Sequence, residues 1–315
     1  MNADANREGF RILRSDPVLL PMELLWRWSF GLGLLALLFA SYARFRHAVL
    51  LSDADMAALT SQDPFVVSAA AAALIADAIP LLLPTMAQIA AVAAALWIAA
   101  AALGRGIVTR IIVRRFAAVY AVAVAVDAPR WAWFAALNFA RVLMLLIPLV
   151  GYLGGAFLAG VVSGTGPNTG QNTVTSALIT FGVFAASAVL WSYVNWVLSL
   201  APLFVVRDGL APLDSVVAAI AFIARNHSRL RSVALWNSTL RGVAATVISL
   251  AGVLTVATFS MSSPLPSWVA TLLLVSETLA YLIISDIFLL ARLAAYASVA
   301  VRELSLSQPP PEPRA

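Results

Sequence analysis

The stretch PRWAWFAALNFARVLMLLIPLV, residues 129–150, displays the character of the whole chain. It is almost entirely apolar, yet Arg141 lies near its middle and Asn138 stands three residues before that arginine. An apolar run of about 20 residues is long enough to cross the hydrocarbon core of a bilayer as a helix. The stretch therefore predicts a transmembrane helix with a permanent charge about 15 Å from its start, at a rise of about 1.5 Å per residue.

The composition of the rest of the chain agrees with a membrane location. The chain has 315 residues, of which 62% are hydrophobic and 11% are charged, whereas soluble domains carry about 25% charged residues. The net charge is +5, which suits a protein that faces anionic lipid on one side. The absence of cysteine excludes disulfides and thiolate chemistry. No aromatic-interleaved basic patch stands outside the apolar runs, so nucleic acid is not an expected partner.

Six stretches are long enough to span a bilayer. The sequence thus predicts an all-α integral membrane protein with about six transmembrane helices, at residues 22–43, 80–103, 131–158, 174–203, 233–260 and 267–291. The segment 65–79, FVVSAAAAALIADAI, is shorter and ends beside Asp77 and Pro80. We interpret it as an interfacial helix or as an extension of the second span, and the sequence does not choose between the two.

Two further apolar stretches are too short to cross, and arginines bracket both. Their uncharged cores run from Phe116 to Val126 and from Ser215 to Ala224. Segments of this kind lie in the interface plane with the arginines toward the lipid headgroups. The predicted contacts with anionic headgroups are Arg110, Arg114, Arg115, Arg225, Arg229 and Arg231.

The arginines predict the orientation, because basic residues concentrate on the cytoplasmic side of a membrane. With six spans, four arginine-rich regions fall on one side: the N-terminal segment, the two interfacial segments and the C-terminal segment. The opposite side has only Arg44 and Arg46. We therefore expect an inner or plasma membrane protein whose two termini are cytoplasmic.

An internal repeat is also suggested. The chain can be aligned on itself so that Trp97 matches Trp196. In this alignment Asn138 matches Asn237, and Arg141 falls one residue short of Arg241. Two further pairs also match, Asp127 with Asn226 and Arg130 with Arg229. An even number of crossings separates the two units, which makes the repeat parallel; chance matching in Ala/Val/Leu-rich sequence is the alternative. The expected division is an N-terminal segment 1–21, a first span and outer connection 22–79, repeat units 80–160 and 174–260, a last span 267–303 and a disordered proline-rich tail 304–315.

Ionisable side chains inside a membrane are costly and need a polar partner. The residues Asn138 and Arg141, Asn237 and Arg241, and the acidic pair Glu277 and Asp286 form a candidate intramembrane polar centre. Three interpretations stay open: ion pairs that fix helix register, a site for a lipid or an anionic substrate, and proton coupling through the carboxylates.

Other polar and small residues have simpler readings. Trp26 and Trp28 fit an interfacial aromatic anchor. The glycines of GYLGG, residues 151–155, and Gly31 and Gly33 are typical of close helix packing.

No enzyme motif is present: there is no phosphate-binding loop, no HExxH and no GxSxG. Asp53 and Asp55 in SDAD have no further ligands nearby and fit a solvated turn. We expect no catalytic, cofactor or metal site.

The segment APLFVVRDGLAPLDSVVAAIAFIARNHSRL, residues 201–230, resembles a segment of the bacterial membrane domain that is fused to glycerophosphodiester phosphodiesterases, and of related multi-span proteins without the enzyme. The resemblance rests on the order of Pro202, Val205–Val206, Asp208–Gly209, Pro212 and the basic tip Arg225–Arg229. Arg207 before the acidic residue, and a tip without an aromatic residue, depart from the pattern. The resemblance implies a multi-span fold over residues 190–300 and no catalytic residue.

These observations favour a non-enzymatic multi-pass membrane protein with a lipid-binding or membrane-organising role, whose partners are anionic membrane lipids. The alternative is a small transporter for a small molecule or an ion that works through the Arg/Glu/Asp centre. The sequence leaves the substrate and the oligomeric state open.

Overall fold

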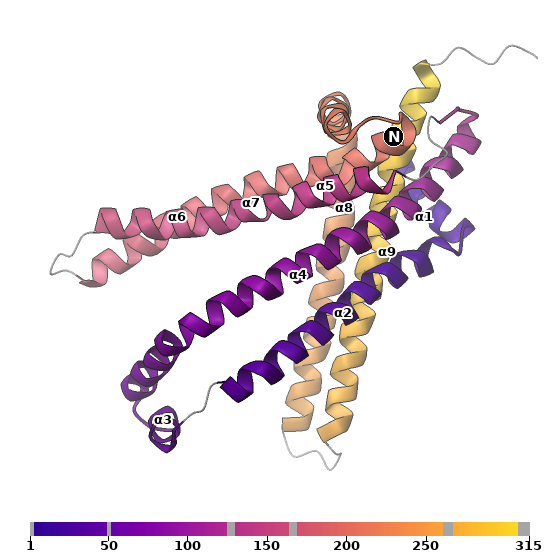
Figure 1. The fold of residues 1–315 in the computed structure, drawn as a ribbon. Helices are drawn as coiled ribbons and strands as arrows, with labels where there is room; N and C mark the ends of the chain where they lie inside the picture. Colours follow the sequence, from indigo (N-terminus) through magenta and orange to yellow (C-terminus); the bar gives the residue numbers. More distant parts are fainter. Residues whose placement is uncertain (1–2, 49–51, 125–129, 164–168, 261–266, 308–315) are drawn as a thin grey trace, which may run out of the picture. The chain divides into compact units, whose positions relative to one another are not determined.

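A computed structural model describes residues 3–48, 52–124, 130–163, 169–260 and 267–307. Helices account for nearly all of these residues, and the described part of the chain contains no strand. This confirms the all-α class. The helices in Figure 1 are α1 (Ala3–Ser15), α2 (Leu19–Ala48), α3 (Asp53–Leu59), α4 (Pro64–Tyr120), α5 (Trp131–Met144), α6 (Leu146–Ser163), α7 (Thr169–Arg207), α8 (Pro212–Ser260) and α9 (Ser267–Ser307).

The six predicted spans are confirmed as helices that are long and apolar enough to cross a membrane. Their apolar parts are Leu19–Ala43, Leu83–Tyr120, Trp131–Val162, Val174–Arg207, Pro212–Phe259 and Trp268–Leu306. In the most apolar windows of α7 and α8 no residue is buried inside the protein. Side chains such as Phe181, Val189 and Val247 are therefore free to meet lipid, as expected for a multi-pass membrane protein.

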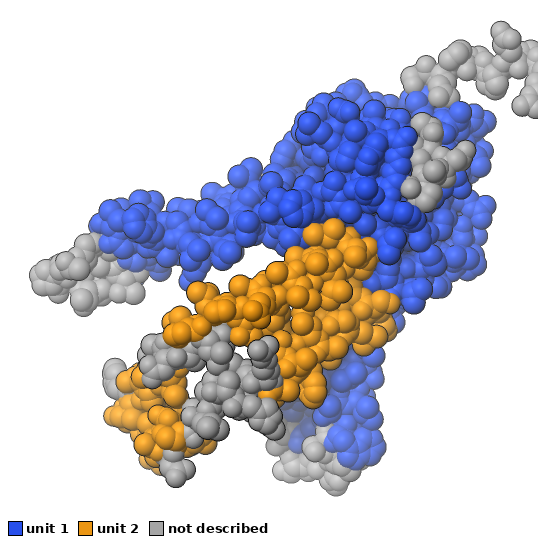
Figure 2. All heavy atoms as spheres, viewed as in Figure 1, with its two compact units in different colours: residues 1–26, 101–315 blue, residues 27–100 orange. Residues whose placement is uncertain are grey.

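The chain divides into two compact units, residues 27–100 and the remainder (Figure 2). Within the smaller unit, the rings of Phe30 and Trp97 meet edge to face at 5.1 Å. The SDAD segment of this unit is a helix start rather than the solvated turn we predicted, because Ser52 caps α3. Ser52 and Asp55 form a capping box, and the hydrogen bonds from Ser52 lower the pKa of Asp55. The carboxylate half of the box is thus strongest when Asp55 is ionised and weakens as the pH falls through the pKa of this group, whereas the bond from the Asp55 backbone N–H to Ser52 Oγ remains.

Helix α4 joins three segments that we treated separately. Residues 65–79 continue directly into the second span, with Pro80 and Pro84 inside the helix, so the extension is the interpretation that the structure favours. The first short arginine-bracketed segment is also continuous with this span as far as Tyr120. Its inner face, with Val108, Ile112 and Phe116, is buried in the larger unit. The second part of its predicted core, beyond Val124, lies outside the described residues.

The second short segment is separated from its neighbours as predicted. Helix α7 ends at Arg207, and Gly209 adopts a positive φ of 68° that favours glycine. Helix α8 then contains a non-helical residue, Asn226, with φ −116° and ψ 20°. The stretch from Pro212 to Arg225 is therefore a helix of its own, joined to the fifth span across a kink. The two predicted repeat units thus differ locally, because the first short segment continues its span and the second is a separate helix. Asp127, which we matched to Asn226, lies outside the described residues.

The predicted third span is broken into α5 and α6 at Leu145. Pro148 has no backbone N–H to donate to the carbonyl of Met144, and its ring crowds that carbonyl. Arg141 consequently lies in the last turn of α5, where the negative end of the helix dipole favours a cation. This position gives a local electrostatic reason for the charge in the middle of an apolar stretch.

The core of the larger unit is built around the second half of α9. Leu290, Ala294, Tyr296 and Val301 are all almost completely buried. Around this segment pack buried residues of α4, α5, α7 and α8. We predicted an apolar run that ends at residue 291, within a last-span segment that ends at residue 303 and is followed by a disordered tail. Helix α9 instead continues to Ser307, four residues into the segment that we predicted as a disordered tail. Apart from Arg292, residues 290–301 (LARLAAYASVAV) are small or apolar, and most of them are buried.

The glycines differ in their packing roles. In α6, a Cβ at Gly151 would collide with Ser187 of α7, and one at Gly155 would lie 3.0 Å from the carbonyl oxygen of Thr180. Gly151 and Gly155 therefore allow the close approach of α6 and α7 that we predicted. Gly31, Gly33 and Gly154 have nothing within 4 Å of a Cβ, so their predicted packing role is not seen. Trp26 is also not an exposed anchor, because it is 8% exposed and fills the space left by Gly104.

Two adjacent glycines of α6 provide a matched test. Gly155→Ala should lower the stability of the α6–α7 hairpin by about 1 kcal/mol, because the new methyl group presses on backbone that cannot move aside easily. Gly154→Ala should be neutral or slightly stabilising, since alanine is the better helix former. Thermal unfolding of the two variants in the same detergent measures the difference. Equal melting temperatures would contradict this packing.

Candidate functional site

The four arginine-rich regions meet at one end of the larger unit. Arg115 of α4 pairs with Asp16, which follows α1, at 3.0 Å between Nε and Oδ2. Arg130 donates from Nη1 to the carbonyl oxygen of Gly209 at 3.1 Å, and its guanidinium lies 4.0 Å from the ring centre of Trp133. Regions that are far apart in the sequence thus form one arginine-rich end of the larger unit.

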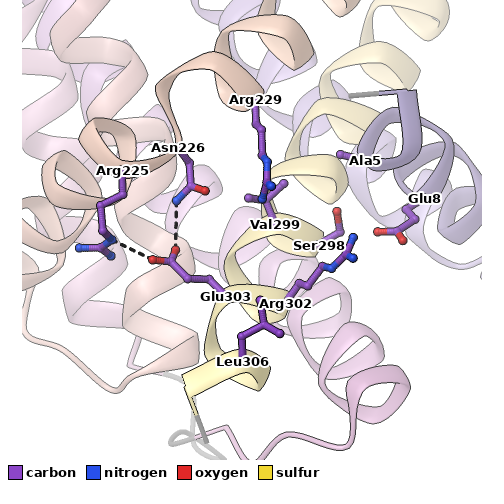
Figure 3. Close-up of a pocket in the computed structure, with 10 residues that line it drawn as sticks. All are labelled: Ala5, Glu8, Arg225, Asn226, Arg229, Ser298, Val299, Arg302, Glu303 and Leu306. Atoms are coloured by element: carbon purple, nitrogen blue, oxygen red, sulfur yellow. Dashed lines mark hydrogen bonds and ion pairs between the residues drawn. The ribbon is translucent and has the colours of Figure 1, made fainter. Parts of the chain in front are cut away.

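A pocket of about 360 Å³ opens at this end between α1, α8 and α9 (Figure 3). In Figure 3 the side chain of Arg229 of α8 extends toward Val299, and that of Arg302 of α9 extends toward Glu8 of α1, next to Ser298. Neither arginine forms a hydrogen bond or an ion pair with any described residue. The full lining is Ala5, Glu8, Arg225, Asn226, Arg229, Ser298, Val299, Arg302, Glu303 and Leu306.

Glu303 fixes the wall opposite α1. Its Oε1 accepts a hydrogen bond from Nε of Arg225 at 2.8 Å, and its Oε2 accepts one from Nδ2 of Asn226 at 3.1 Å. These bonds join the kink of α8 to the last turns of α9 (Figure 3). The Arg225 and Glu303 side chains are 56% and 33% exposed, so the pair contributes more to geometry than to stability.

The remaining acidic group of the pocket is Glu8 of α1. Its Oε2 accepts a hydrogen bond from the hydroxyl of Tyr120 at 3.1 Å, which ties α1 to the end of α4. The pocket therefore contains three arginines, Arg225, Arg229 and Arg302, and two carboxylates. Its formal charge is positive, and the positive charge that has no described partner lies on Arg229 and Arg302.

The six arginines that we predicted to contact headgroups have different positions. Arg225 and Arg229 line the pocket. Arg114, Arg115 and Arg231 are exposed, and Arg110 is half-buried. Sequence reasoning missed Arg302 and Glu303 as pocket residues because they follow the predicted apolar run, which ends at residue 291. The signal that was available is the i,i+4 spacing of Ser298 and Arg302, and of Val299 and Glu303, which makes each pair neighbours on a continued helix.

The two asparagines of the predicted polar centre are buried and have similar surroundings. Nδ2 of Asn138 donates to the carbonyl oxygen of Phe134 at 2.8 Å, and Nδ2 of Asn237 donates to that of Val233 at 2.9 Å. Both are bonds to the preceding helical turn, and the repeat stays a prediction. Asn237 also donates to Oδ1 of Asn6 in α1 at 3.1 Å.

Arg241 and Glu277, two charged members of that centre, do not meet. Oε1 of Glu277 accepts a hydrogen bond from Thr255 at 2.8 Å, and Arg241 forms no hydrogen bond or ion pair with a described residue. Arg241 and Thr255 are about 21 Å apart along α8, at a rise of about 1.5 Å per residue. Asp286 is buried in α9. The geometry thus separates Arg241 from Glu277 and gives no support to a transport centre that contains both.

Among the described residues, no group of three histidine, aspartate or glutamate side chains is placed to hold a metal ion. Comparison with protein-family models, with curated protein sequences and with solved structures finds no match to this chain. The resemblance to the membrane domain fused to phosphodiesterases therefore stays a prediction.

Proposed function

We propose that this multi-pass protein is non-enzymatic and binds the headgroup of an anionic membrane lipid in the pocket of Figure 3, on the cytoplasmic face of an inner or plasma membrane. The observation that carries the proposal is the pair Arg229 and Arg302, which share one pocket without a carboxylate partner among the described residues. Guanidinium groups match phosphate oxygens in shape and charge. An anionic headgroup would supply the missing partner.

The position of the pocket supports a lipid as the source of the anion. Each of the six candidate spans begins or ends at an arginine-rich region. The pocket lies among these regions, and the ends of membrane spans are at the level of the lipid headgroups. Basic pockets between membrane helices are typical headgroup sites. The lining includes Ala5, Val299 and Leu306 beside the charged groups, which suits a ligand with an apolar part. The small positive formal charge fits a headgroup with one phosphodiester.

The double variant Arg229→Gln, Arg302→Gln tests this function. The full chain is reconstituted in nanodiscs of phosphatidylcholine that contain phosphatidylglycerol, and native mass spectrometry counts the anionic lipid that is retained. We expect retention to fall about thirtyfold, since each of the two arginines contributes on the order of 1 kcal/mol to the attraction of anionic lipid near a membrane surface.

The matched control is Arg114→Gln, Arg231→Gln, which removes the same charge from two exposed arginines outside this pocket. The control should retain the lipid nearly as well as the unchanged protein. If both double variants lose lipid equally, the attraction is a general effect of charge and the pocket is not the site. If neither loses lipid, the proposed function is wrong.

A further inference from the structure

A second basic surface lies on the other face of α1, away from the pocket of Figure 3. Arg7, Arg11 and Arg14 follow one another at helical spacing and line a groove of about 680 Å³. The groove is completed by Asn6, Phe10, Ser232 and Trp236. None of the three arginines forms a hydrogen bond or an ion pair with a described residue, and no carboxylate belongs to the lining.

The groove has rigid walls because α1 is firmly attached to α9. A Cβ at Gly9 would lie 2.6 Å from the carbonyl oxygen of Ala291, so the two helices are in backbone contact there. Ile12 is buried in the core, and the rings of Phe10 and Phe288 meet edge to face at 6.1 Å. The bond from Asn237 to Asn6 attaches α1 to α8 at 3.1 Å. The arginines are therefore held on one face rather than carried by a loose terminus.

The three arginines of the groove lie close together on one helix, and no carboxylate in the lining offsets their charge. Like charges at positions i and i+4 destabilise a helix, and Arg7 and Arg14 are only about 10 Å apart along the axis. The pocket of Figure 3 offsets three arginines with two carboxylates, whereas this groove has three arginines and no carboxylate. A bound ligand with several negative charges would remove the repulsion.

The neutral members of the groove indicate the rest of the ligand. Asn6 and Ser232 provide hydrogen-bonding groups beside the arginines. Trp236 is 53% exposed, and tryptophan at such a position is typical of the headgroup level of a membrane. The groove thus combines a row of positive charges with an apolar wall, which fits an anion attached to an acyl chain better than a small free anion.

We infer that this groove is a second, separate binding site, and that it takes a phospholipid headgroup with two phosphate groups. Three guanidinium groups in a row can meet two phosphates at once, each through charge-assisted hydrogen bonds. The inference does not depend on the pocket of Figure 3, whose smaller charge fits one phosphate.

The test uses the full chain in phosphatidylcholine nanodiscs that contain cardiolipin and phosphatidylglycerol at equal total charge. Native mass spectrometry should show a preference for cardiolipin, which has two phosphates, of about tenfold, the effect of one additional charge-assisted hydrogen bond. In the triple variant Arg7→Gln, Arg11→Gln, Arg14→Gln the preference should fall to about one. The variant Arg229→Gln, Arg302→Gln should keep it, which separates this site from the proposed function.

Two further measurements make the outcome decisive. The variant Arg7→Lys, Arg11→Lys, Arg14→Lys keeps the charge of α1 and should keep a large part of the preference, which excludes misfolding of α1 as the cause of its loss. Inorganic pyrophosphate is titrated against the detergent-solubilised protein as the free-anion probe. Tight binding of pyrophosphate without a cardiolipin preference would assign the groove to a soluble diphosphate and overturn the lipid. Absence of both would overturn the site.

Discussion

Replacing Arg207 with methionine should lower the free energy of unfolding by about 3 kcal/mol, a large fraction of the stability of a typical protein. The Arg207 side chain is only 11% exposed. Its Nε and Nη2 donate to the two carboxylate oxygens of Asp208 at 2.7 and 2.6 Å. Its Nη1 donates to the carbonyl oxygen of Ala300 at 2.9 Å, and its guanidinium lies 4.7 Å from the ring centre of Phe204.

The cost arises from the groups that the substitution leaves behind. Asp208 would lose its cation while 24% exposed, and the carbonyl of Ala300 would lose a donor inside the core. Removing one partner of a largely buried ion pair is far more costly than removing an exposed pair. Methionine retains much of the apolar stem, so the measured loss reports mainly the charge and the hydrogen bonds.

Arg225→Met is the matched control, because Arg225 also pairs with a carboxylate but is 56% exposed. It should lower stability by less than about 1 kcal/mol. Reversible unfolding in mixed micelles, followed by circular dichroism, gives both values under the same conditions. Similar losses in the two variants would show that Arg207 does not hold α7 to α9 in the way described here.

Gly9→Ala should lower stability by about 2 kcal/mol and loosen α1 from α9. The added Cβ would lie 2.6 Å from the carbonyl oxygen of Ala291 and 3.1 Å from the nitrogen of Ala295. Both atoms belong to the backbone of a buried helix, which cannot shift without disturbing the core. This loss exceeds the gain in helix propensity of about 1 kcal/mol that alanine normally brings.

Gly242→Ala in α8 provides the opposite expectation, since nothing lies within 4 Å of a Cβ there. It should leave stability unchanged or raise it by up to about 1 kcal/mol. Thermal unfolding reports the sign for each variant, and hydrogen exchange of the α1 amides reports whether that helix has become detached. A stabilising effect at Gly9 would mean that α1 and α9 are not in backbone contact.

Length and hydropathy were sufficient to predict the class and the six spans, because a bilayer admits few other structures. The arginine pattern likewise predicted which regions would gather at one end. The break at Leu145 was less evident, although Pro148 in LLIPLV was a visible signal. The continuity of α4 was missed because arginines were read as the boundary of a span, whereas a long helix can continue past its charged turn.

Only some residues of the candidate site could be predicted from the sequence. Arg225 and Arg229 were predicted as lipid contacts, but Arg302 faces the same pocket only because α9 continues beyond the expected membrane boundary. The hydrogen-bond partner of Glu277 depends on the register of α9 against α8, and the spacing of residues within one helix does not determine that register. The estimated depths in the membrane placed Arg241 and Glu277 at a similar level, whereas in the structure Glu277 accepts a hydrogen bond from Thr255.

The placement of the core in α9 has a consequence for the order in which the protein assembles. Helix α9 is synthesised after α1 to α8, yet its residues from Leu290 to Val301 are the ones that the other helices surround. The earlier helices are therefore inserted before the segment that their buried faces contact has left the ribosome. Closure of the arginine-rich end is thus a late event, which we expect to follow insertion of all the preceding spans.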